Sequence, residues 1–227
     1  MTGTSKTPRE RYRTQVREEV KERAWEQIAT AGASALSLNA IAKRMGMSGP
    51  ALYRYFGSRD ELITELIRDA YRSQATAFRA AGEEGADLAG LAHTLRRWAL
   101  EDPQRYFLVY GTPVPGYHAP DDVTALASEI MSTLLDACAA ASAGSAGSAG
   151  SAGSAGTDAA TAFGDHLEHH RQWARGHSAP PAALHRALSF WTRLHGVLSL
   201  ELAGHFTGMG FDPSLLFTAE LNGLLPH

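Results

Sequence analysis

Apolar residues recur every three or four positions along most of the chain, which is the spacing of an amphipathic helix. The pattern is clear in the ranges 16–31, 62–71, 88–99 and 184–202. Strands would instead show apolar and polar residues alternating between closely spaced turn signals, and the sequence contains no such segment. The sequence therefore predicts an all-α protein.

Two short helices are predicted between residues 37 and 57. The first covers 38–45, and Gly46 ends it because glycine accepts the positive φ that often follows a helix. The second begins after Ser48 and continues to Gly57, with Pro50 in its first turn, where a missing N–H costs nothing. Two short helices joined by a glycine-containing turn form a helix-turn-helix, whose second helix is shaped to enter the major groove of DNA.

Longer helices flank this pair. A helix that ends at Gly32 is expected to pack across the two short ones. It begins with four arginines that either reach the DNA backbone as an arm or are merely solvated: Arg9, Arg11, Arg13 and Arg17. Another helix begins after Ser58, with acidic residues in its first turn where the helix dipole favours them, and runs to about residue 81. We therefore expect a three-helix DNA-binding domain over 10–57 and a C-terminal regulatory and dimerisation domain over 58–227.

Short motifs at fixed spacing run through this stretch. They are Ser37, Ile41-Ala42, Gly46-Met47-Ser48, Leu52-Tyr53-Arg54-Tyr55-Phe56 and Ser58-Arg59-Asp60-Glu61-Leu62. The set resembles the DNA-binding domain of the tetracycline-repressor (TetR) family of transcriptional regulators. It departs from the family pattern at Arg59, where Lys is usual, and at Tyr55, where His is common, and both residues keep a phosphate donor. Farther on, Trp191-x-x-x-His195-Gly196 resembles the Trp-x-x-x-His-Gly signature of one class of TetR-type C-terminal domains.

The resemblance implies a one-component regulator, a repressor that binds a pseudo-palindromic operator in double-stranded DNA as a homodimer and is released by a small apolar ligand. It places nine residues at the DNA: Ser37, Lys43, Arg44, Ser48, Gly49, Pro50, Tyr53, Tyr55 and Arg59. Gly49 and Pro50 have no hydrogen-bonding side chain, so sequence readout is expected to depend on Lys43, Arg44 and DNA shape. No cofactor or metal is implied. Phe56 is expected in the core and Tyr53 outside it.

Charge is distributed unevenly along the chain. Residues 1–72 contain 13 Lys and Arg against 9 Asp and Glu, a net charge of +4, whereas residues 73–227 contain 8 against 15, a net charge of −7. A basic N-terminal third on an acidic protein is expected where only that third meets phosphate. The single cysteine, Cys138, excludes an internal disulfide and fits a reducing cytoplasm. Residues 1–13 have no apolar core segment of a signal peptide, and no run of about 18 apolar residues predicts a membrane span.

The C-terminal domain is predicted to be a set of helices separated by breakers. The range 110–120 is dense in Gly and Pro and is expected to form a loop. Residues 142–156 are five Ser-Ala-Gly repeats, a composition typical of a flexible linker. Three helices are expected after it, over 158–176, 182–206 and 211–225. The second of these has a broad apolar surface, so we expect 158–176 and 182–206 to form the homodimer interface.

Seven residues are candidates for lining a small-molecule pocket: Trp98, Tyr106, Phe107, Tyr110, Trp173, Trp191 and His195. Each of them singly also fits an ordinary aromatic core, and the strongest pair is Trp191 with His195, four apart on one helix face.

Two alternatives stay open. One is a DNA-binding regulator without any ligand. The other is a metal-binding enzyme, for which the histidines His166 and His170 have helical i,i+4 spacing. No HExxH motif, phosphate-binding loop or nucleophile elbow accompanies them, so we expect no enzyme.

Overall fold

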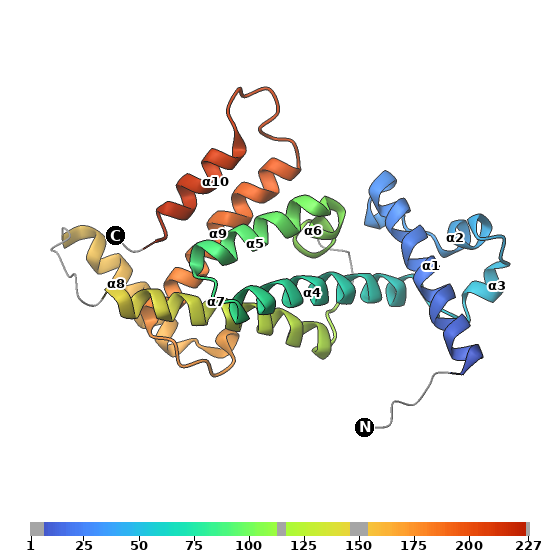
Figure 1. Cartoon of the computed structure of the whole chain (residues 1–227), viewed down its shortest axis with the longest axis horizontal. Coiled ribbons are helices and arrows are strands. Elements are labelled where there is room, and N and C mark those ends of the chain that lie inside the picture. The colour runs from blue at the N-terminus through green and yellow to red at the C-terminus, as the bar shows by residue number, and fades with distance from the viewer. Residues whose placement is uncertain (1–6, 113–116, 146–153, 226–227) are drawn as a thin grey trace. The chain divides into compact units, whose positions relative to one another are not determined.

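A computed structural model describes residues 7–112, 117–145 and 154–225 (Figure 1). All regular secondary structure in these ranges is helical, which confirms the all-α prediction. The helices are α1 (Pro8–Ala31), α2 (Leu38–Arg44), α3 (Gly49–Leu52), α4 (Arg59–Glu83), α5 (Leu88–Glu101), α6 (Pro103–Tyr110), α7 (Asp121–Ser145), α8 (Ser154–His169), α9 (Pro181–Leu202) and α10 (Pro213–Asn222), with 3-10 turns η1 (Ala33–Ala35) and η2 (Gln172–Ala174).

The chain divides into two compact units. The first consists of residues 1–70 and 107–119, and the second of residues 71–106 and 120–227. Helix α4 begins in the first unit and continues into the second, because the division falls after Ala70.

The first unit is built on α1. Thr7 and Glu10 form a capping box at its start, and Gly32, at φ +79°, ends it as the sequence predicts. One stripe of α1 is fully or almost fully buried, together with the apolar faces of α2 and α4 and the ring of Phe56. The α1 stripe consists of Val16, Val20, Ala24 and Ile28.

The second short helix is shorter than the sequence predicts. Regular helix α3 ends at Leu52, and residues 53–55 form a turn. The reason is a change of hydrogen-bonding partner: the Tyr55 N–H donates to the Leu52 carbonyl, three residues back, at 2.8 Å. The Gly57 N–H then donates to the Glu61 carboxylate of α4 at 2.7 Å, so α4 binds the backbone that would have extended α3.

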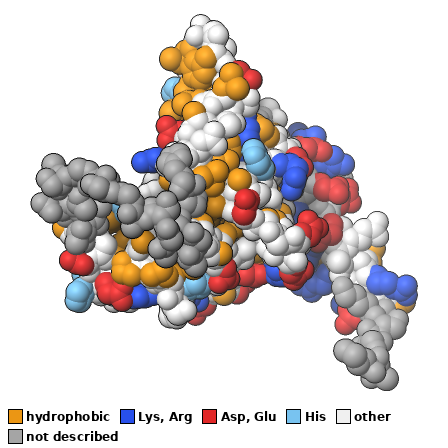
Figure 2. Space-filling model, turned by 60° about the vertical axis from the view of Figure 1, so that its left-hand side comes forward, with side chains coloured by type: hydrophobic (Ala, Val, Ile, Leu, Met, Phe, Trp, Pro, Cys, Tyr) orange, Lys and Arg blue, Asp and Glu red, His pale blue; other side chains and the backbone are white. Residues whose placement is uncertain are grey.

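Helix α9 is the centre of the second unit. It packs against α5, α7, α8 and α10. Its buried residues therefore lie on more than one side of the helix, among them Leu184, Phe190, Leu194 and Leu198. The connection from α9 to α10 carries exposed apolar side chains at its tip, and Figure 2 shows hydrophobic side chains gathered there. Met209 and Phe211 belong to this tip and are 63% and 42% exposed.

Three predicted C-terminal boundaries are wrong. Helix α8 ends at His169 and not at residue 176, because the chain turns through η2 and reaches Arg175 at φ +43°. Helix α9 ends at Leu202 and not at residue 206, since Gly204 takes a φ of +76°. Helix α10 covers Pro213–Asn222 and not 211–225, because Asp212 caps its start and the Gly223 N–H closes its end on the Ala219 carbonyl.

The predicted flexible linker is partly helical. Helix α7 extends through residue 145 and α8 begins at residue 154, so helical backbone covers both ends of the 142–156 repeat. Residues 146–153 of the repeat lie outside the described residues.

One stretch of α7, Asp121–Ser142, is long and apolar enough to cross a membrane by length and composition alone, although no membrane span was predicted from the sequence. Within this stretch the buried side chains are those of Val123, Ile130, Leu134, Leu135 and Cys138. Glu129 forms an ion pair with Arg79 of α4, and α7 packs against α9 and α5.

Arg96 is predicted to be the main polar support of α9 in the second unit. Its guanidinium binds both carboxylate oxygens of Glu201, at 2.5 and 2.8 Å, and lies 5.0 Å from the centre of the Phe217 ring. Both side chains of the ion pair are at most 16% exposed. Substitution Arg96→Met should lower the free energy of unfolding by about 2–3 kcal/mol, since it leaves a half-buried carboxylate without its partner. Urea denaturation measures this, and Arg97→Met, at an exposed neighbouring position, should change it by less than about 0.5 kcal/mol.

Candidate functional site

The start of α2 is held by its own side chain and by α1. Ser37 is the N-cap, and its hydroxyl accepts a hydrogen bond from the Ala40 N–H at 3.3 Å. The Ser37 N–H donates to the Gln27 side chain of α1 at 3.0 Å. Gly46, at φ +65°, then ends α2 as predicted, and the Met47 N–H donates to the Ala42 carbonyl at 2.9 Å. These contacts fix the angle at which α3 leaves α2.

The nine DNA candidates of the sequence analysis gather on and beside the α2–α3 pair. Five of them are exposed: Lys43, Arg44, Ser48, Pro50 and Tyr53. Ser37, Gly49, Tyr55 and Arg59 are half-buried. Tyr53 is 46% exposed whereas Phe56 is fully buried, so these two aromatic rings have opposite environments, as expected. The Ser48 hydroxyl makes no cap bond to α3.

Two of the cationic candidates are already paired within the chain. Arg44 binds Glu26 of α1 at 2.7 Å. The Arg59 guanidinium donates to the carbonyls of Ala33 at 2.8 Å and Leu36 at 3.2 Å, and so ties η1 and the start of α2 to α4. Lys43, in contrast, has no ion pair among the described residues.

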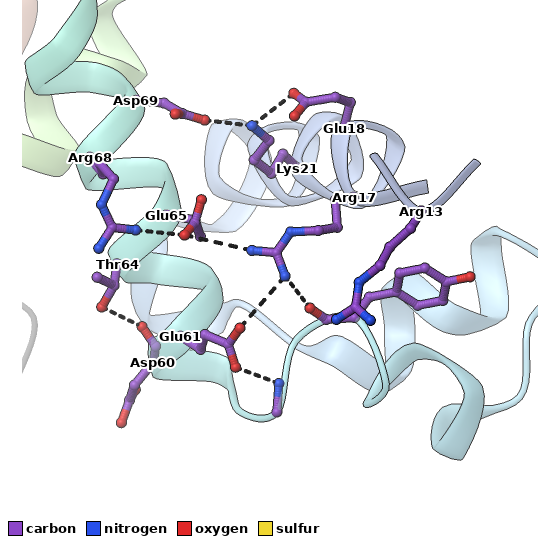
Figure 3. A network of polar contacts seen from close by, with 12 residues as sticks. Arg13, Arg17, Glu18, Lys21, Asp60, Glu61, Thr64, Glu65, Arg68 and Asp69 are labelled. Carbon is purple, nitrogen blue, oxygen red and sulfur yellow. Dashed lines mark hydrogen bonds and ion pairs between the residues drawn. The ribbon is translucent and has the colours of Figure 1, made fainter. Parts of the chain in front are cut away.

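The role of Arg17 was not predicted from the sequence, which placed it among arginines that either reach the DNA backbone or are merely solvated. Its side chain is only 25% exposed and points from α1 toward α4 (Figure 3). Arg17 donates to the Tyr55 carbonyl and pairs with Glu61 and Glu65 at 3.7 and 3.6 Å. Arg17 directly follows the buried Val16 in the chain. This position beside the apolar stripe of α1 is the one feature of the sequence that distinguishes Arg17 from the other arginines of the helix start.

The contact between Asn39 of α2 and the start of α3 was also not predicted from the sequence. Asn39 is exposed, and its amide oxygen lies 3.1 Å from the position that a Cβ on Gly49 would occupy. Glycine at 49 therefore lets the Asn39 side chain lie against the first turn of α3. The i,i+4 spacing of Asn39 and Lys43 places both on one face of α2 and could have indicated this.

Four of the seven ligand candidates form one cluster in the second unit. The ring centres of Tyr106 and His195 are 5.6 Å apart, those of Trp191 and His195 are 4.4 Å apart, and those of Trp98 and Tyr106 are 6.4 Å apart. The cluster is polar as well as aromatic, because the Tyr106 hydroxyl lies 3.0 Å from His195 Nδ1 and 2.8 Å from the Ser199 hydroxyl.

The other three candidates are not placed in this cluster. Phe107 and Tyr110 lie half-buried on α6, in the part of the chain that belongs to the first unit. Trp173 lies half-buried on η2 and makes no ring contact among the described residues. An open depression of about 450 Å³ is lined by residues other than the seven candidates, on one face of α5: His93, Arg96, Arg97, Leu100 and Glu101.

Burial decides the protonation of the cluster. It lowers the pKa of the His195 imidazole to about 4, so this ring is neutral at pH 7. It also raises the pKa of the Tyr106 hydroxyl above its ordinary value. Elsewhere in the second unit, burial raises the pKa of the Cys138 thiol to about 12. His195 and Tyr106 are therefore neutral hydrogen-bonding groups in the core of this unit at pH 7.

The two histidines of the metal alternative, His166 and His170, are exposed on and just after the end of α8. The rings of His166 and His170 stack with their centres 4.1 Å apart, and the Nδ1 atom of His170 lies 2.8 Å from the His166 carbonyl oxygen. In the described ranges, no group of three or more His, Cys, Asp or Glu residues is arranged to hold a metal ion.

His195 should make the stability of the second unit depend on pH. Its folded pKa of about 4 lies below the ordinary value of 6.5, so protonation favours the unfolded chain. The stabilisation is complete above pH 6.5 and is lost as the pH falls toward 4, by up to about 3 kcal/mol. Urea denaturation between pH 4 and 7 should show a flatter profile for His195→Asn than for the wild type. The matched variant His205→Asn, at an exposed position, should keep the wild-type slope.

Family models match both parts of the chain. Residues 22–66 match a model described as bacterial regulatory proteins, tetR family. Residues 88–224 match a model described as the tetracyclin repressor-like C-terminal domain. The first match contains α2, α3 and the start of α4, and the second contains the aromatic cluster.

Whole-chain relatives agree with these matches. The chain is 36% identical over 218 residues to the HTH-type transcriptional regulators Rv1816 of Mycobacterium tuberculosis and Mb1846 of Mycobacterium bovis, covering 92% of this chain and 90% of each relative. It is 71% identical to SCO4313, which is described as a candidate regulatory protein, and whose crystal structure superposes with a TM-score of 0.83 over 96% of this chain and 99% of that one. A protein of unknown function from Rhodococcus sp. RHA1, 22% identical, shares the fold with a TM-score of 0.66 over 93% of this chain and 96% of that one. The chain belongs to the TetR family of DNA-binding transcriptional regulators.

Proposed function

We propose that the protein is a repressor that binds a pseudo-palindromic operator as a two-fold homodimer and is released by a small, largely apolar ligand. One observation carries the DNA part of the proposal. The α2–α3 pair exposes the ammonium group of Lys43 and the hydroxyl groups of Ser48 and Tyr53. These groups surround the start of α3, where Gly49 and Pro50 have no hydrogen-bonding side chain. Cations and donors around a helix that can approach closely are what a DNA backbone and groove require.

Each candidate has a proposed task. Ser37, Ser48, Tyr53 and Tyr55 would donate to phosphates on either side of the groove, while Gly49 and Pro50 would allow α3 to approach the bases. Lys43 would contact a phosphate, in place of the sequence readout expected for it above, and Arg44 would leave Glu26 for the DNA. Arg59 would keep the start of α2 in place, because its Nε and Nη2 atoms already donate to carbonyls of the chain.

The dimer is proposed to form through α8 and α9. One helix-turn-helix reaches few phosphates, whereas two copies read half-sites about 34–36 Å apart and grip twice as many. Exposed Phe163 on α8 and half-buried Trp191 on α9 supply apolar surface for a second copy. In the proposed organisation residues 10–57 bind DNA and residues 58–227 dimerise and bind the ligand.

The ligand is proposed to enter the cluster around Tyr106 and His195. Its neutral, mostly aromatic groups favour an apolar molecule with a polar group that replaces one of the Tyr106 hydrogen bonds. Helix α4 would carry the signal, since it continues from the second unit into the first. The ligand needs to favour the DNA-incompetent state by only about 1.4 kcal/mol for each tenfold loss of operator affinity.

The salt dependence of DNA affinity should distinguish the contribution of Lys43 from that of Tyr53. Substitution Lys43→Gln should weaken binding to all DNA sequences and reduce the slope of log affinity against log salt by about 0.9 for each phosphate that the lysine neutralises. Tyr53→Phe should weaken binding without changing that slope, because it removes a hydroxyl and no charge. Fluorescence anisotropy with a labelled duplex at several salt concentrations measures both. Arg97→Gln, an exposed arginine of the second unit, is the control, and an equally weakened affinity for it would contradict the proposed interface.

Truncation of the cluster should separate DNA binding from ligand response. In Tyr106→Phe and Ser199→Ala, which remove the two hydroxyl groups of the cluster and lie outside the proposed dimer surface, operator affinity should stay within about threefold of the wild type. A compound found by screening apolar molecules for release of the wild-type protein from DNA should no longer release these variants. Release that is unchanged in both variants would place the ligand elsewhere. If no compound in a broad screen releases the wild type, the alternative of a regulator without a small-molecule ligand is favoured.

A further inference from the structure

We propose that Arg17 is a positioning residue for operator binding, which holds the turn after α3 in the conformation that presents Tyr53 and Tyr55 to DNA. This inference rests on the proposed function. We call residues 53–55 the recognition turn.

The recognition turn has a backbone that its own helix cannot satisfy. The carbonyls of α3 accept hydrogen bonds from the residues that follow, as that of Leu52 does from the Tyr55 N–H, whereas the carbonyls of Arg54 and Tyr55 lie beyond the helix. Two arginines of α1 reach these carbonyls. Arg17 Nη1 donates to the Tyr55 carbonyl, and Arg13 Nη2 lies 3.4 Å from the Arg54 carbonyl. Cations at the C-terminal end of a helix also oppose its dipole.

Arg17 is itself fixed from the other side by α4 (Figure 3). Its guanidinium lies 3.7 Å from Glu61 and 3.6 Å from Glu65, and its central carbon is 4.1 Å from the centre of the buried Phe56 ring. Glu65 in turn binds Arg68 at 2.5 Å. A planar group with five donors can bind a carbonyl and two carboxylates while stacked on a ring, and an ammonium group cannot.

Glu61 closes the arrangement. Its second carboxylate oxygen accepts the Gly57 N–H at 2.7 Å, so Glu61 binds the backbone on the far side of Phe56 while it faces Arg17. The recognition turn is thereby held between α1 and the first two turns of α4 through one guanidinium. Tyr55 is bonded directly at its carbonyl, and Tyr53 lies two residues before it. Replacement of Arg17 should therefore release the turn while every group that touches DNA stays in the protein.

The chain offers a matched control on the same helix. Lys21 lies one helical turn after Arg17 and pairs with Asp69 of α4 at 2.6 Å and with Glu18 at 2.7 Å. It joins α1 to α4, and none of its ion pairs involves the recognition turn. Lys21→Met should therefore lower the stability of the first unit without affecting the recognition turn. Only the Arg17 variants should also release the recognition turn.

The experiment compares Arg17→Lys and Arg17→Met with Lys21→Met in the full-length protein. The probe is a DNA duplex that the wild-type protein selects from a random-sequence library. Both Arg17 variants should bind it about tenfold more weakly, with the slope of log affinity against log salt unchanged, because the same phosphates are neutralised. Lys21→Met should bind within about twofold of the wild type. Amide hydrogen exchange, measured without DNA, should be faster at Tyr55, Phe56 and Gly57 in the Arg17 variants and not in Lys21→Met.

Each other outcome overturns the inference. A salt slope reduced by about 0.9 per half-site would show that Arg17 neutralises a phosphate itself. Unchanged affinity in Arg17→Lys, or exchange that rises equally throughout the unit in Arg17→Met and Lys21→Met, would leave it a stabilising residue only. If the wild type selects no duplex, the proposed function fails and the positioning role fails with it. If the wild type binds and Arg17→Lys binds equally well, only the inference fails.

Discussion

A helix of one turn has no stability of its own, and the first unit is organised around that constraint. Helix α3 contains four residues, and its C-terminal end is supported by other parts of the first unit. Leu52 and Phe56 are fully buried, the Glu61 carboxylate holds the Gly57 N–H, and arginines of α1 bind the carbonyls that follow the helix. The element that we propose to approach DNA is therefore only as rigid as its contacts with α1 and α4, and a shift of the start of α4 would act on it directly.

The second unit has a polar network within an apolar core. Tyr106, His195 and Ser199 share hydrogen bonds, and Tyr106 on α6 is 89 residues before His195 on α9. Buried polar groups of this kind specify one arrangement of the surrounding helices, because any other would leave donors without acceptors. The same property suits a regulatory site, since a ligand that takes over one of these hydrogen bonds shifts the balance between two packed arrangements.

The sequence predicted what depends on local pattern and missed what depends on distant partners. Apolar spacing revealed every long helix, and Gly32 and Gly46 end helices where expected. The end of α3 was wrong because the residues that bind its backbone, Arg17 and Glu61, lie on other helices. Arg17 resembles its arginine neighbours in sequence and differs only in packing. Four of seven aromatic candidates meet because α5, α6 and α9 converge, which periodicity does not reveal. The domain limits and DNA residues remain predictions.

The buried cysteine has a practical consequence for spectroscopy. Cys138 is the one thiol in the chain, it is fully buried, and its pKa of about 12 leaves almost no thiolate at neutral pH. Since the thiolate is the reactive form of cysteine, maleimide dyes and nitroxide spin labels should not react with Cys138. A cysteine placed on exposed surface would then carry the sole label of each chain without removal of the native residue. Distances between the recognition turns of two copies would become measurable in solution by resonance energy transfer or electron spin methods.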